Sequence, residues 1–249
     1  MDAIVDQGEE SARELRDWKD WFAAYDDPES PLVKRLAAVQ QGIRRALDEA
    51  PSGVINVLSL CAGEGRDLIP VLADHPRRTD VRARLIEFDP VIAQKARDAV
   101  AAAGLGGVSG VSGVSGVSGV SGTDGLGGSD AIVDVTTGDA ADPALFGDYA
   151  PAHLLLLCGI FGNITEADIQ NTATRAAHLT ALGGTAIWTR HRHDPAVIPR
   201  IHGWFGDAGF SDLWESDTDL PTVIYVAANR QEREPTPLPD GRKLFTFVR

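Results

Sequence analysis

Apolar residues along the chain follow two periods, and their alternation predicts a sheet with helices on both faces. Short β patterns occur at 54–60, 81–88, 132–136, 153–158 and 185–189, and the fourth of them is a continuous apolar run, typical of a parallel strand buried on both faces. Between these segments apolar residues recur at helical spacing, at 66–74, 91–103, 165–181 and 194–209. Strands that alternate with helices form parallel units with right-handed crossovers, so we expect a doubly wound α/β fold.

Both ends of the chain add elements to this pattern. Helical spacing covers 11–24 and 31–50, and Ser30 before Pro31 is typical of an N-cap followed by proline at the first helical position. After the last helix, short β patterns at 210–215, 222–228 and 244–248 predict antiparallel strands at one edge of the sheet.

Residues 104–130 interrupt the pattern with a glycine-rich insertion. Positions 107–121 are five Gly-Val-Ser triplets, which bury too little apolar surface to offset the entropy of ordering, so we expect a flexible loop. The insertion follows the helix after the second strand and should join the amino edge of the sheet. Ligands of open α/β sheets bind at the carboxyl edge, so we expect the insertion to lie far from the chemistry.

A glycine turn follows the first strand. Gly63 and Gly65 let the backbone approach a ligand closely, and the helix that follows offers unpaired N–H groups. Glu87, 22 residues after Gly65, ends the second strand, where a carboxylate accepts hydrogen bonds from a ribose diol. Three alternatives stay open: the turn as a plain strand-to-helix connection, Asp89 as the ribose partner, and Glu87 as a helix cap.

With these motifs, residues 51–249 resemble the class I S-adenosylmethionine-dependent methyltransferases. The family's turn reads acidic-x-Gly-x-Gly-x-Gly, and the matching residues here are Ser59, Cys61, Gly63 and Gly65. The serine and the cysteine depart from the family. They leave open whether Glu64 or backbone carbonyls bind the methionine ammonium group, with Arg66 a candidate for its carboxylate.

The resemblance implies a doubly wound, mostly parallel seven-stranded sheet with antiparallel C-terminal edge strands and two extra N-terminal helices. It implies S-adenosylmethionine as cofactor, with Glu87 on the ribose, Phe88 on the adenine and Asp139 accepting the adenine amino group. Residues 1–50 would then form a helical lid or cover on the cofactor domain. The expected cofactor-binding residues are Cys61, Ala62, Gly63, Glu64, Gly65, Glu87, Phe88, Asp139, Ala140, Cys158 and Gly159.

The acceptor side is defined by fewer residues. His191 and His193 follow the fifth strand and are candidates for a general base, because histidine titrates near neutrality. Arg190 could hold an acidic substrate, as could Arg192, and Asn163 could orient a polar group. The aromatic residues Trp18, Trp21 and Tyr25 are candidates for a lid over the substrate. The other interpretation is that these residues are solvated loop residues and the cover of a sheet edge.

Composition narrows the function classes. A net charge of −13 argues against a nucleic-acid partner and favours a small-molecule acceptor. Two cysteines, no apolar run of about 18 residues and an acidic N-terminus predict a cytoplasmic protein without a membrane segment or secretory signal. No Cys/His spacing predicts a metal site.

Two alternatives to an active methyltransferase stay open. The first is an NAD(P)-dependent oxidoreductase, although Leu68 stands where its third glycine is expected. The second is a non-catalytic cofactor-binding protein. The sequence leaves the acceptor and the oligomeric state open.

Overall fold

The computed structural model describes residues 27, 30–106, 132–192, 194, 196–216 and 224–248. The predicted helix at 11–24, residues 107–131 of the insertion, and the candidate residues Trp18, Trp21, Tyr25 and His193 lie outside this part of the chain.

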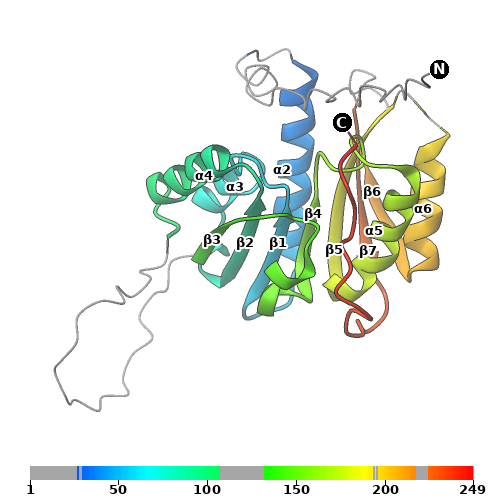
Figure 1. The fold of residues 1–249 in the computed structure, drawn as a ribbon. Coiled ribbons are helices and arrows are strands. Elements are labelled where there is room, and N and C mark those ends of the chain that lie inside the picture. The colour runs from blue at the N-terminus through cyan, green and yellow to red at the C-terminus, as the bar shows by residue number, and fades with distance from the viewer. Residues whose placement is uncertain are drawn as a thin grey trace, which may run out of the picture.

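One seven-stranded sheet forms the centre of the fold, in the order β3-β2-β1-β4-β5-β7-β6. Strands β1 to β5 are parallel to their neighbours, and β7 runs antiparallel to both β5 and β6. The carboxyl ends of the parallel strands meet at the upper edge in Figure 1. The strands are β1 (Ile55–Leu60), β2 (Val81–Glu87), β3 (Ile132–Thr137), β4 (Ala152–Leu157), β5 (Thr180–His191), β6 (Phe210–Glu215) and β7 (Ile224–Gln231).

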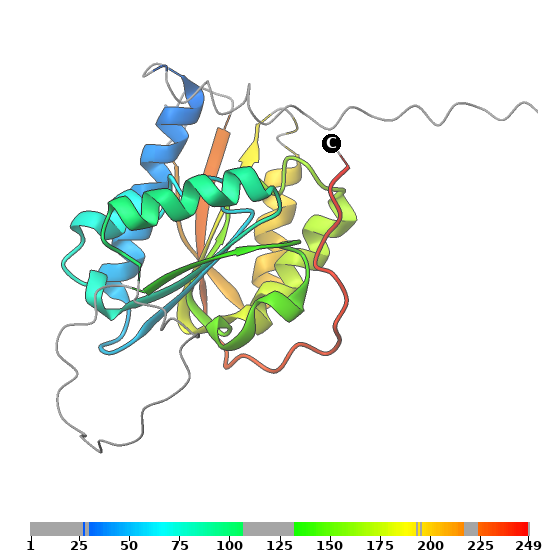
Figure 2. The same cartoon turned by 60° about the vertical axis from the view of Figure 1, so that its left-hand side comes forward.

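Helices cover both faces of the sheet, which confirms the doubly wound fold (Figure 2). Leu154 and Leu156 of β4 face one apolar core, and Leu155 and Leu157 face the other. The alternation explains the continuous apolar run, because successive side chains point to opposite faces and both faces are buried. The helices are α2 (Pro31–Glu49), α3 (Ile69–Asp74), α4 (Pro90–Ala102), α5 (Glu166–Leu179) and α6 (Val197–Asp207), with 3-10 turns η1 (Arg78–Asp80), η2 (Pro143–Leu145) and η3 (Gly147–Tyr149).

Helix α2 belongs to the sheet's own core. Ser30 caps it as predicted, since its hydroxyl accepts the Leu32 N–H at 3.2 Å. Val39, Ile43 and Leu47 are buried in the same cluster as strands β1 and β7. The division of the chain at residue 50 into a lid and a cofactor domain stays a prediction.

The prediction of a third C-terminal edge strand, at 244–248, is wrong. Residues 240–248, which we name the C-terminal strap, run alongside α5 instead (Figure 1). The Leu244 carbonyl accepts hydrogen bonds from Asn171 at 2.6 Å and Thr172 at 3.2 Å, and the one isolated strand-like bridge of the strap among the described residues joins Phe247 to Ile164. The connection from β3 to β4 contains only the short turns η2 and η3, and the strap packs against it, where the Leu244 N–H donates to the Ala141 carbonyl at 2.9 Å. Leu244 and Phe245 of the strap are buried in the core on this face, whereas Phe247 and Val248 are exposed.

Several predicted boundaries also shift. Strand β5 extends to His191, so Arg190 and His191, which we expected after the fifth strand, are its last two residues. Helix α5 ends at Leu179, two residues before the predicted end, and β5 starts at once. The Leu182-Gly183-Gly184 segment therefore lies inside β5, near an irregularity in the β4–β5 register. Helix α3 begins at Ile69 rather than at residue 66, because the glycine turn extends through Leu68.

The insertion joins the fold at the amino edge. Leu105, after α4, accepts the N–H of Val133 at the start of β3, at 3.1 Å. Among the described residues, no helix is both long and apolar enough to cross a membrane.

Candidate functional site

The turn after β1 is shaped by three residues with left-handed backbone. Cys61, Gly63 and Gly65 have φ values of 55°, 58° and 72°. A Cβ on Gly65 would lie 2.4 Å from Ile69 Cδ1, so packing as well as φ requires glycine there. Cys61 adopts the same conformation without being glycine, which costs about 1 kcal/mol. The turn therefore has a left-handed backbone at each of the three positions where the methyltransferase motif has glycine.

Glu87 fixes this turn to the end of β2. Its Oε2 accepts the Gly63 N–H at 2.8 Å and its Oε1 accepts the Asp89 N–H at 3.0 Å. Asp89 is the helix cap, since its Oδ1 accepts the N–H groups at the start of α4, at 2.7 and 3.2 Å. Burial raises the pKa of Glu87, and the backbone N–H groups oppose that rise. Of the two candidate carboxylates, Glu87 is thus the one built into the glycine turn.

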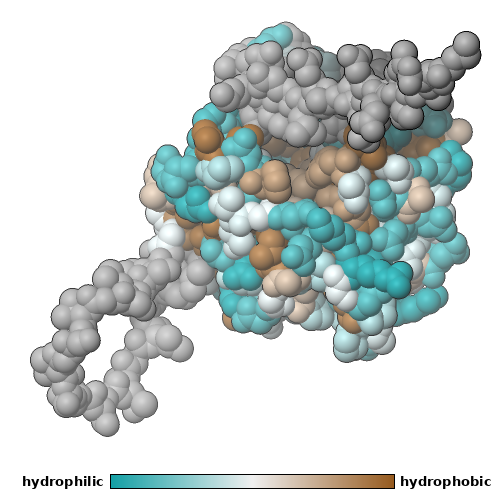
Figure 3. Space-filling view, in the orientation of Figure 1, coloured by the Kyte–Doolittle hydropathy of each residue, from teal (hydrophilic) through white to brown (hydrophobic). Residues whose placement is uncertain are grey.

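Apolar surface lies beside this carboxylate. Phe88 is 74% exposed and Val91, in the first turn of α4, is 60% exposed. Figure 3 shows apolar surface gathered toward the upper edge of the described residues, where the parallel strands end in Figure 1. An exposed aromatic ring next to a hydrogen-bonding carboxylate suits a flat ligand with a polar, hydroxyl-bearing part.

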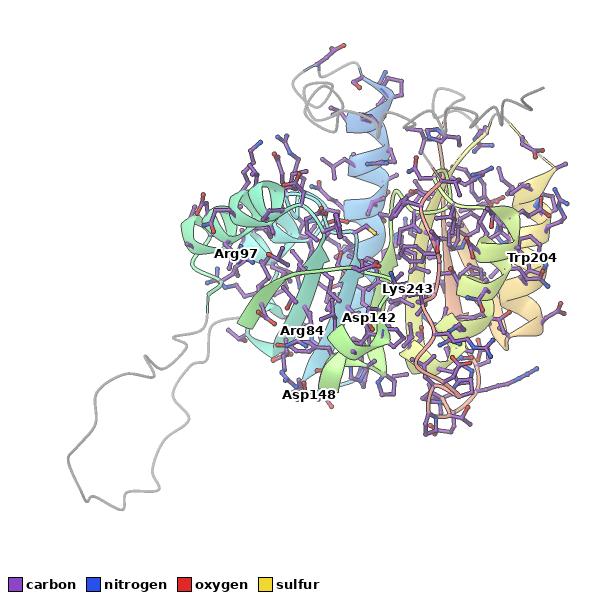
Figure 4. The ribbon with its side chains drawn as sticks, viewed as in Figure 1. Arg84, Arg97, Asp142, Asp148, Trp204 and Lys243 are labelled. Atoms are coloured by element: carbon purple, nitrogen blue, oxygen red, sulfur yellow. The ribbon has the colours of Figure 1, made fainter. Side chains whose placement is uncertain are left out.

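Asp139 follows β3 and is held from two sides. Its Oδ1 accepts the Ala141 N–H at 2.9 Å, and its Oδ2 lies 2.7 Å from Lys243 Nζ of the C-terminal strap. Figure 4 shows Lys243 close to Asp142 of the same loop. The Asp139 side chain raises the pKa of Lys243. Sequence reasoning missed Lys243, because 100 residues or more separate it from this loop and only the strap brings it there.

Glu64 and Arg66, the candidates for the methionine end, bind each other. Arg66 Nε lies 2.7 Å from Glu64 Oε2, and Lys95 Nζ lies 2.8 Å from Glu64 Oε1. Burial works against ionisation of Glu64, yet the hydrogen bonds from Lys95 and Arg66 lower its pKa. Both oxygens of this carboxylate therefore already have cationic partners.

A second carboxylate in this region was missed from the sequence. Asp67, two residues after Gly65, is half-buried, and its Oδ1 accepts the Leu68 N–H at 2.9 Å. Burial raises the pKa of Asp67, while the charge of Arg35 on α2 opposes the rise. Asp67 also acts electrostatically on the Cys158 thiol at the end of β4. Asp67 follows the glycine turn directly in the sequence, and this position could have identified it as a candidate binding residue.

Strands β1 and β4 are neighbours, so Cys61 and Cys158 end adjacent strands as predicted. Burial raises the pKa of both thiols, which keeps them protonated and unreactive. Gly159 has φ 78°, and a Cβ added to it would meet no atom of the described residues within 4 Å, so the backbone is open on that side.

The turn after β4 is fixed by polar contacts to β5 and to its own residues. Gly159 donates its N–H to Thr189 Oγ1 at 2.8 Å and accepts the Asn163 amide at 2.7 Å. The His191 ring packs on the same turn, with Cδ2 2.8 Å from where a Gly162 Cβ would stand, and Arg190 donates to the Phe161 carbonyl. Asn163, Arg190 and His191 thus meet around one turn.

Among the described residues, no group of three or more His, Cys, Asp or Glu side chains is arranged to hold a metal ion.

No protein-family model matches this sequence, and no curated protein matches it either. Solved structures do match. An O-methyltransferase family protein from Burkholderia thailandensis aligns with a TM-score of 0.53 and 17% identity, over 84% of this chain and 61% of the other. Magnesium protoporphyrin IX methyltransferase from Synechocystis PCC 6803, a structure with bound SAM, aligns with a TM-score of 0.58 and 13% identity, over 86% and 90%.

At these identities the similarity establishes the fold. The chain has the α/β fold of the class I S-adenosylmethionine-dependent methyltransferases. It spans 61% of the length of the Burkholderia protein.

Proposed function

We propose that the protein is an S-adenosylmethionine-dependent methyltransferase that acts on a small-molecule acceptor. The observation that carries this proposal is the contact between the Glu87 carboxylate and the Gly63 N–H, at 2.8 Å, beside an exposed Phe88. A carboxylate, a glycine turn and an exposed aromatic ring that lie together at one edge of the sheet support the binding of a nucleoside there.

In this proposal, each carboxylate binds a different part of the cofactor. Glu87 accepts the ribose hydroxyls through the acceptor positions that its two backbone bonds leave. Phe88 packs on the adenine, and Asp139 with Ala140 receives its amino edge. Asp67 binds the methionine ammonium group, because Ser59 carries no charge and Glu64 is already paired with two cations.

When bound, the cofactor supplies a methyl group activated by a sulfonium. The chain's own task is to hold the acceptor in line and, for an acceptor that must lose a proton, to receive that proton. His191 is our candidate for the base, because its ring lies on the turn that starts with Gly159. The catalytic role of His193 and the substrate-binding roles of Trp18, Trp21 and Tyr25 stay predictions. Asn163 and Arg190 hydrogen-bond to the turn after β4, and in this proposal they also contact the substrate.

Two observations favour this function over a dinucleotide oxidoreductase. Leu68 is fully buried where the third glycine of the dinucleotide fingerprint would bring helix and strand together. The sheet also has antiparallel β7 between β5 and β6, whereas the usual dinucleotide-binding sheet continues with parallel strands. The net charge of −13 supports a small molecule over a nucleic acid, and the two unpaired cysteines support a cytoplasmic location.

Titration calorimetry with S-adenosylhomocysteine and, separately, with NADH tests the proposal. We expect the first to bind with one-to-one stoichiometry and the second to give no saturable heat. Binding of NADH alone would overturn the methyltransferase proposal. Binding of S-adenosylmethionine that is never converted to S-adenosylhomocysteine, under any acceptor supplied, would favour the non-catalytic alternative.

A further inference from the structure

The residue after β5 is an arginine whose hydrogen-bonding edge has no protein partner among the described residues. Two nitrogens of Arg192, Nε and Nη2, are screened from solvent, and neither has a hydrogen-bond partner within the part of the chain that the structure describes. Arg82 and Arg84, by contrast, have carboxylate oxygens at 2.7 and 2.9 Å. A buried donor without an acceptor is unfavourable. This edge is therefore suited to an acceptor that the chain does not supply itself.

The identity of the two nitrogens determines which ligand fits. Nε and Nη2 lie on one side of the planar guanidinium, and their N–H groups point in parallel at the spacing of two carboxylate oxygens. Cζ of Arg192 lies over the Tyr225 ring, 4.9 Å from the ring centroid. A cation–π contact of this kind restrains the guanidinium, and Nε and Nη2 remain without a hydrogen-bond acceptor among the described residues.

The carboxylates around the Tyr225 ring, on which Arg192 lies, bind other partners. The Tyr225 hydroxyl donates to Glu215 and lies 2.7 Å from His202 Nε2, and His202 Nδ1 lies 2.6 Å from Asp212 Oδ1. Burial, with the hydrogen bond to Glu215, raises the pKa of Tyr225, so the phenol stays neutral beside the guanidinium. The positive charge of Arg192 is thus not matched by a directly bonded anion among the described residues.

Arg192 also lies on the acceptor side of the sheet. The preceding residues, Arg190 and His191, contact the turn after β4 at Phe161 and Gly162. The same turn begins with Gly159, whose backbone is open on one side. A ligand held at Arg192 would therefore lie beyond the end of β5, next to the turn that we assign to the methyl-transfer end of the site.

We propose that Arg192 recognises a carboxylate on the methyl acceptor, which makes the substrate a small carboxylic acid. The inference rests on the proposed methyltransferase function. A phosphate dianion carries more charge than one guanidinium neutralises, and Arg190 donates to the Phe161 carbonyl instead. The net charge of −13 repels anions at long range, but salt screens such repulsion beyond about 8 Å. Whether an anion binds therefore depends on the two parallel N–H groups of Arg192, which we call its fork.

The test is an NMR titration of the Arg192 Nε–H signal, identified by its absence from Arg192→Lys. Sodium benzoate is the probe, and benzamide is its neutral match of the same shape. Both are titrated into the free protein and into the protein with S-adenosylhomocysteine. We expect benzoate to shift the signal saturably and benzamide to leave it unchanged.

Variants separate recognition by the fork from general attraction of anions, with benzoate affinity read from other shifted signals. Arg192→Met should abolish saturable binding, and Arg192→Lys, which keeps the charge and loses the fork, should weaken it about tenfold. Arg200→Met is the control, because Arg200 is paired with Glu166 at 2.6 Å on the surface of α6 and should not affect benzoate.

Two results would overturn the carboxylate site: no response to benzoate in either form of the protein, or an equal response to benzamide. Failure of S-adenosylhomocysteine to bind would instead contradict the proposed function, and the titration of the free protein would still test Arg192.

Discussion

Cys61 stands where the methyltransferase motif that this turn resembles has glycine, and it adopts a backbone conformation that glycine favours. Its φ is 55°, in the left-handed region, as for Gly63 and Gly65. Its partly buried side chain packs on the core that β1 shares with α5 and α6. Burial of the side chain thus offsets the cost of the backbone conformation. Substitution at a motif position therefore need not disable the turn.

Glu87 carries the first prediction at the scale of a residue. Replacing Glu87 by Ala removes a carboxylate that we expect on the ribose, and calorimetry should show S-adenosylhomocysteine bound more weakly by about 1–3 kcal/mol. Glu166→Ala is a matched control, because Glu166 pairs with Arg200 on the surface, where both side chains are nearly half exposed. Unchanged affinity in a folded Glu87→Ala protein would remove Glu87 from the site.

Asp67 couples stability to function. Its pKa is raised above the ordinary 3.8 by burial, so the folded state favours the neutral acid. The stability that this carboxyl contributes is fully present below about pH 3.8 and is lost as the pH rises through the folded pKa. Asp67→Asn stays neutral and keeps an acceptor for the Leu68 N–H. We expect the cofactor-free variant to be more stable than the wild type at pH 7, with the difference vanishing toward pH 3.8.

The same variant should bind S-adenosylhomocysteine more weakly by about 1–3 kcal/mol, because the ammonium group loses an anionic partner. Urea denaturation across a pH series measures the first effect, and calorimetry measures the second. Asp74→Asn, on the exposed end of α3, serves as control for both. If Asp67→Asn binds normally, the ammonium group has another partner.

At the scale of elements, the C-terminal strap replaces an expected edge strand. Arg175 of α5 holds it at Asp240, at 2.8 Å, and the Val248 N–H donates to the Asn163 carbonyl at 2.9 Å. Lys243 lies between these points and reaches Asp139. The strap therefore links α5, the loop after β3 and the turn after β4, so its packing bears on both ends of the proposed cofactor site.

Leu244 tests this role of the strap. It is fully buried, so Leu244→Ala should lower the free energy of unfolding by about 2–5 kcal/mol, as for other buried leucines. Phe247→Ala is the control in the same segment, because Phe247 is 37% exposed and should cost less. Urea denaturation of the two variants decides the matter: equal small losses would mean that the strap is not part of the core.

At the scale of the whole molecule, the two ends of the insertion and the proposed site lie at opposite edges of the sheet. Leu105 and Val133 are joined by a backbone hydrogen bond of 3.1 Å at the amino edge, so the ends of the insertion are already close together. Closing a shorter loop between fixed ends changes the entropy little. We expect replacement of residues 107–128 by a short Gly-Ser linker to change S-adenosylhomocysteine affinity by less than about 0.5 kcal/mol, as measured by calorimetry. A larger loss would show that the insertion reaches the site.

The sequence by itself determined the class of fold and the glycine turn. Both follow from local rules: buried parallel strands require continuous apolar runs, helices require their own period, and a ligand-binding turn requires left-handed residues directly after a strand. The same rules found Glu87, because it ends a strand and follows the turn at the expected interval. They misread residues 244–248, because a short apolar segment indicates burial and does not say which element buries it: Leu244 and Phe245 are buried, but not in the sheet.

Tertiary structure decided which charges meet. Glu64 pairs with Lys95 of α4, Asp139 pairs with Lys243 of the strap, and Asp89 caps α4 while Glu87 binds the turn. It also left Nε and Nη2 of Arg192 without a hydrogen-bond partner among the described residues, while Arg190 donates to the Phe161 carbonyl. Such pairings join residues far apart in the chain, and they depend on distances of a few ångströms that no local pattern of apolar and polar positions encodes.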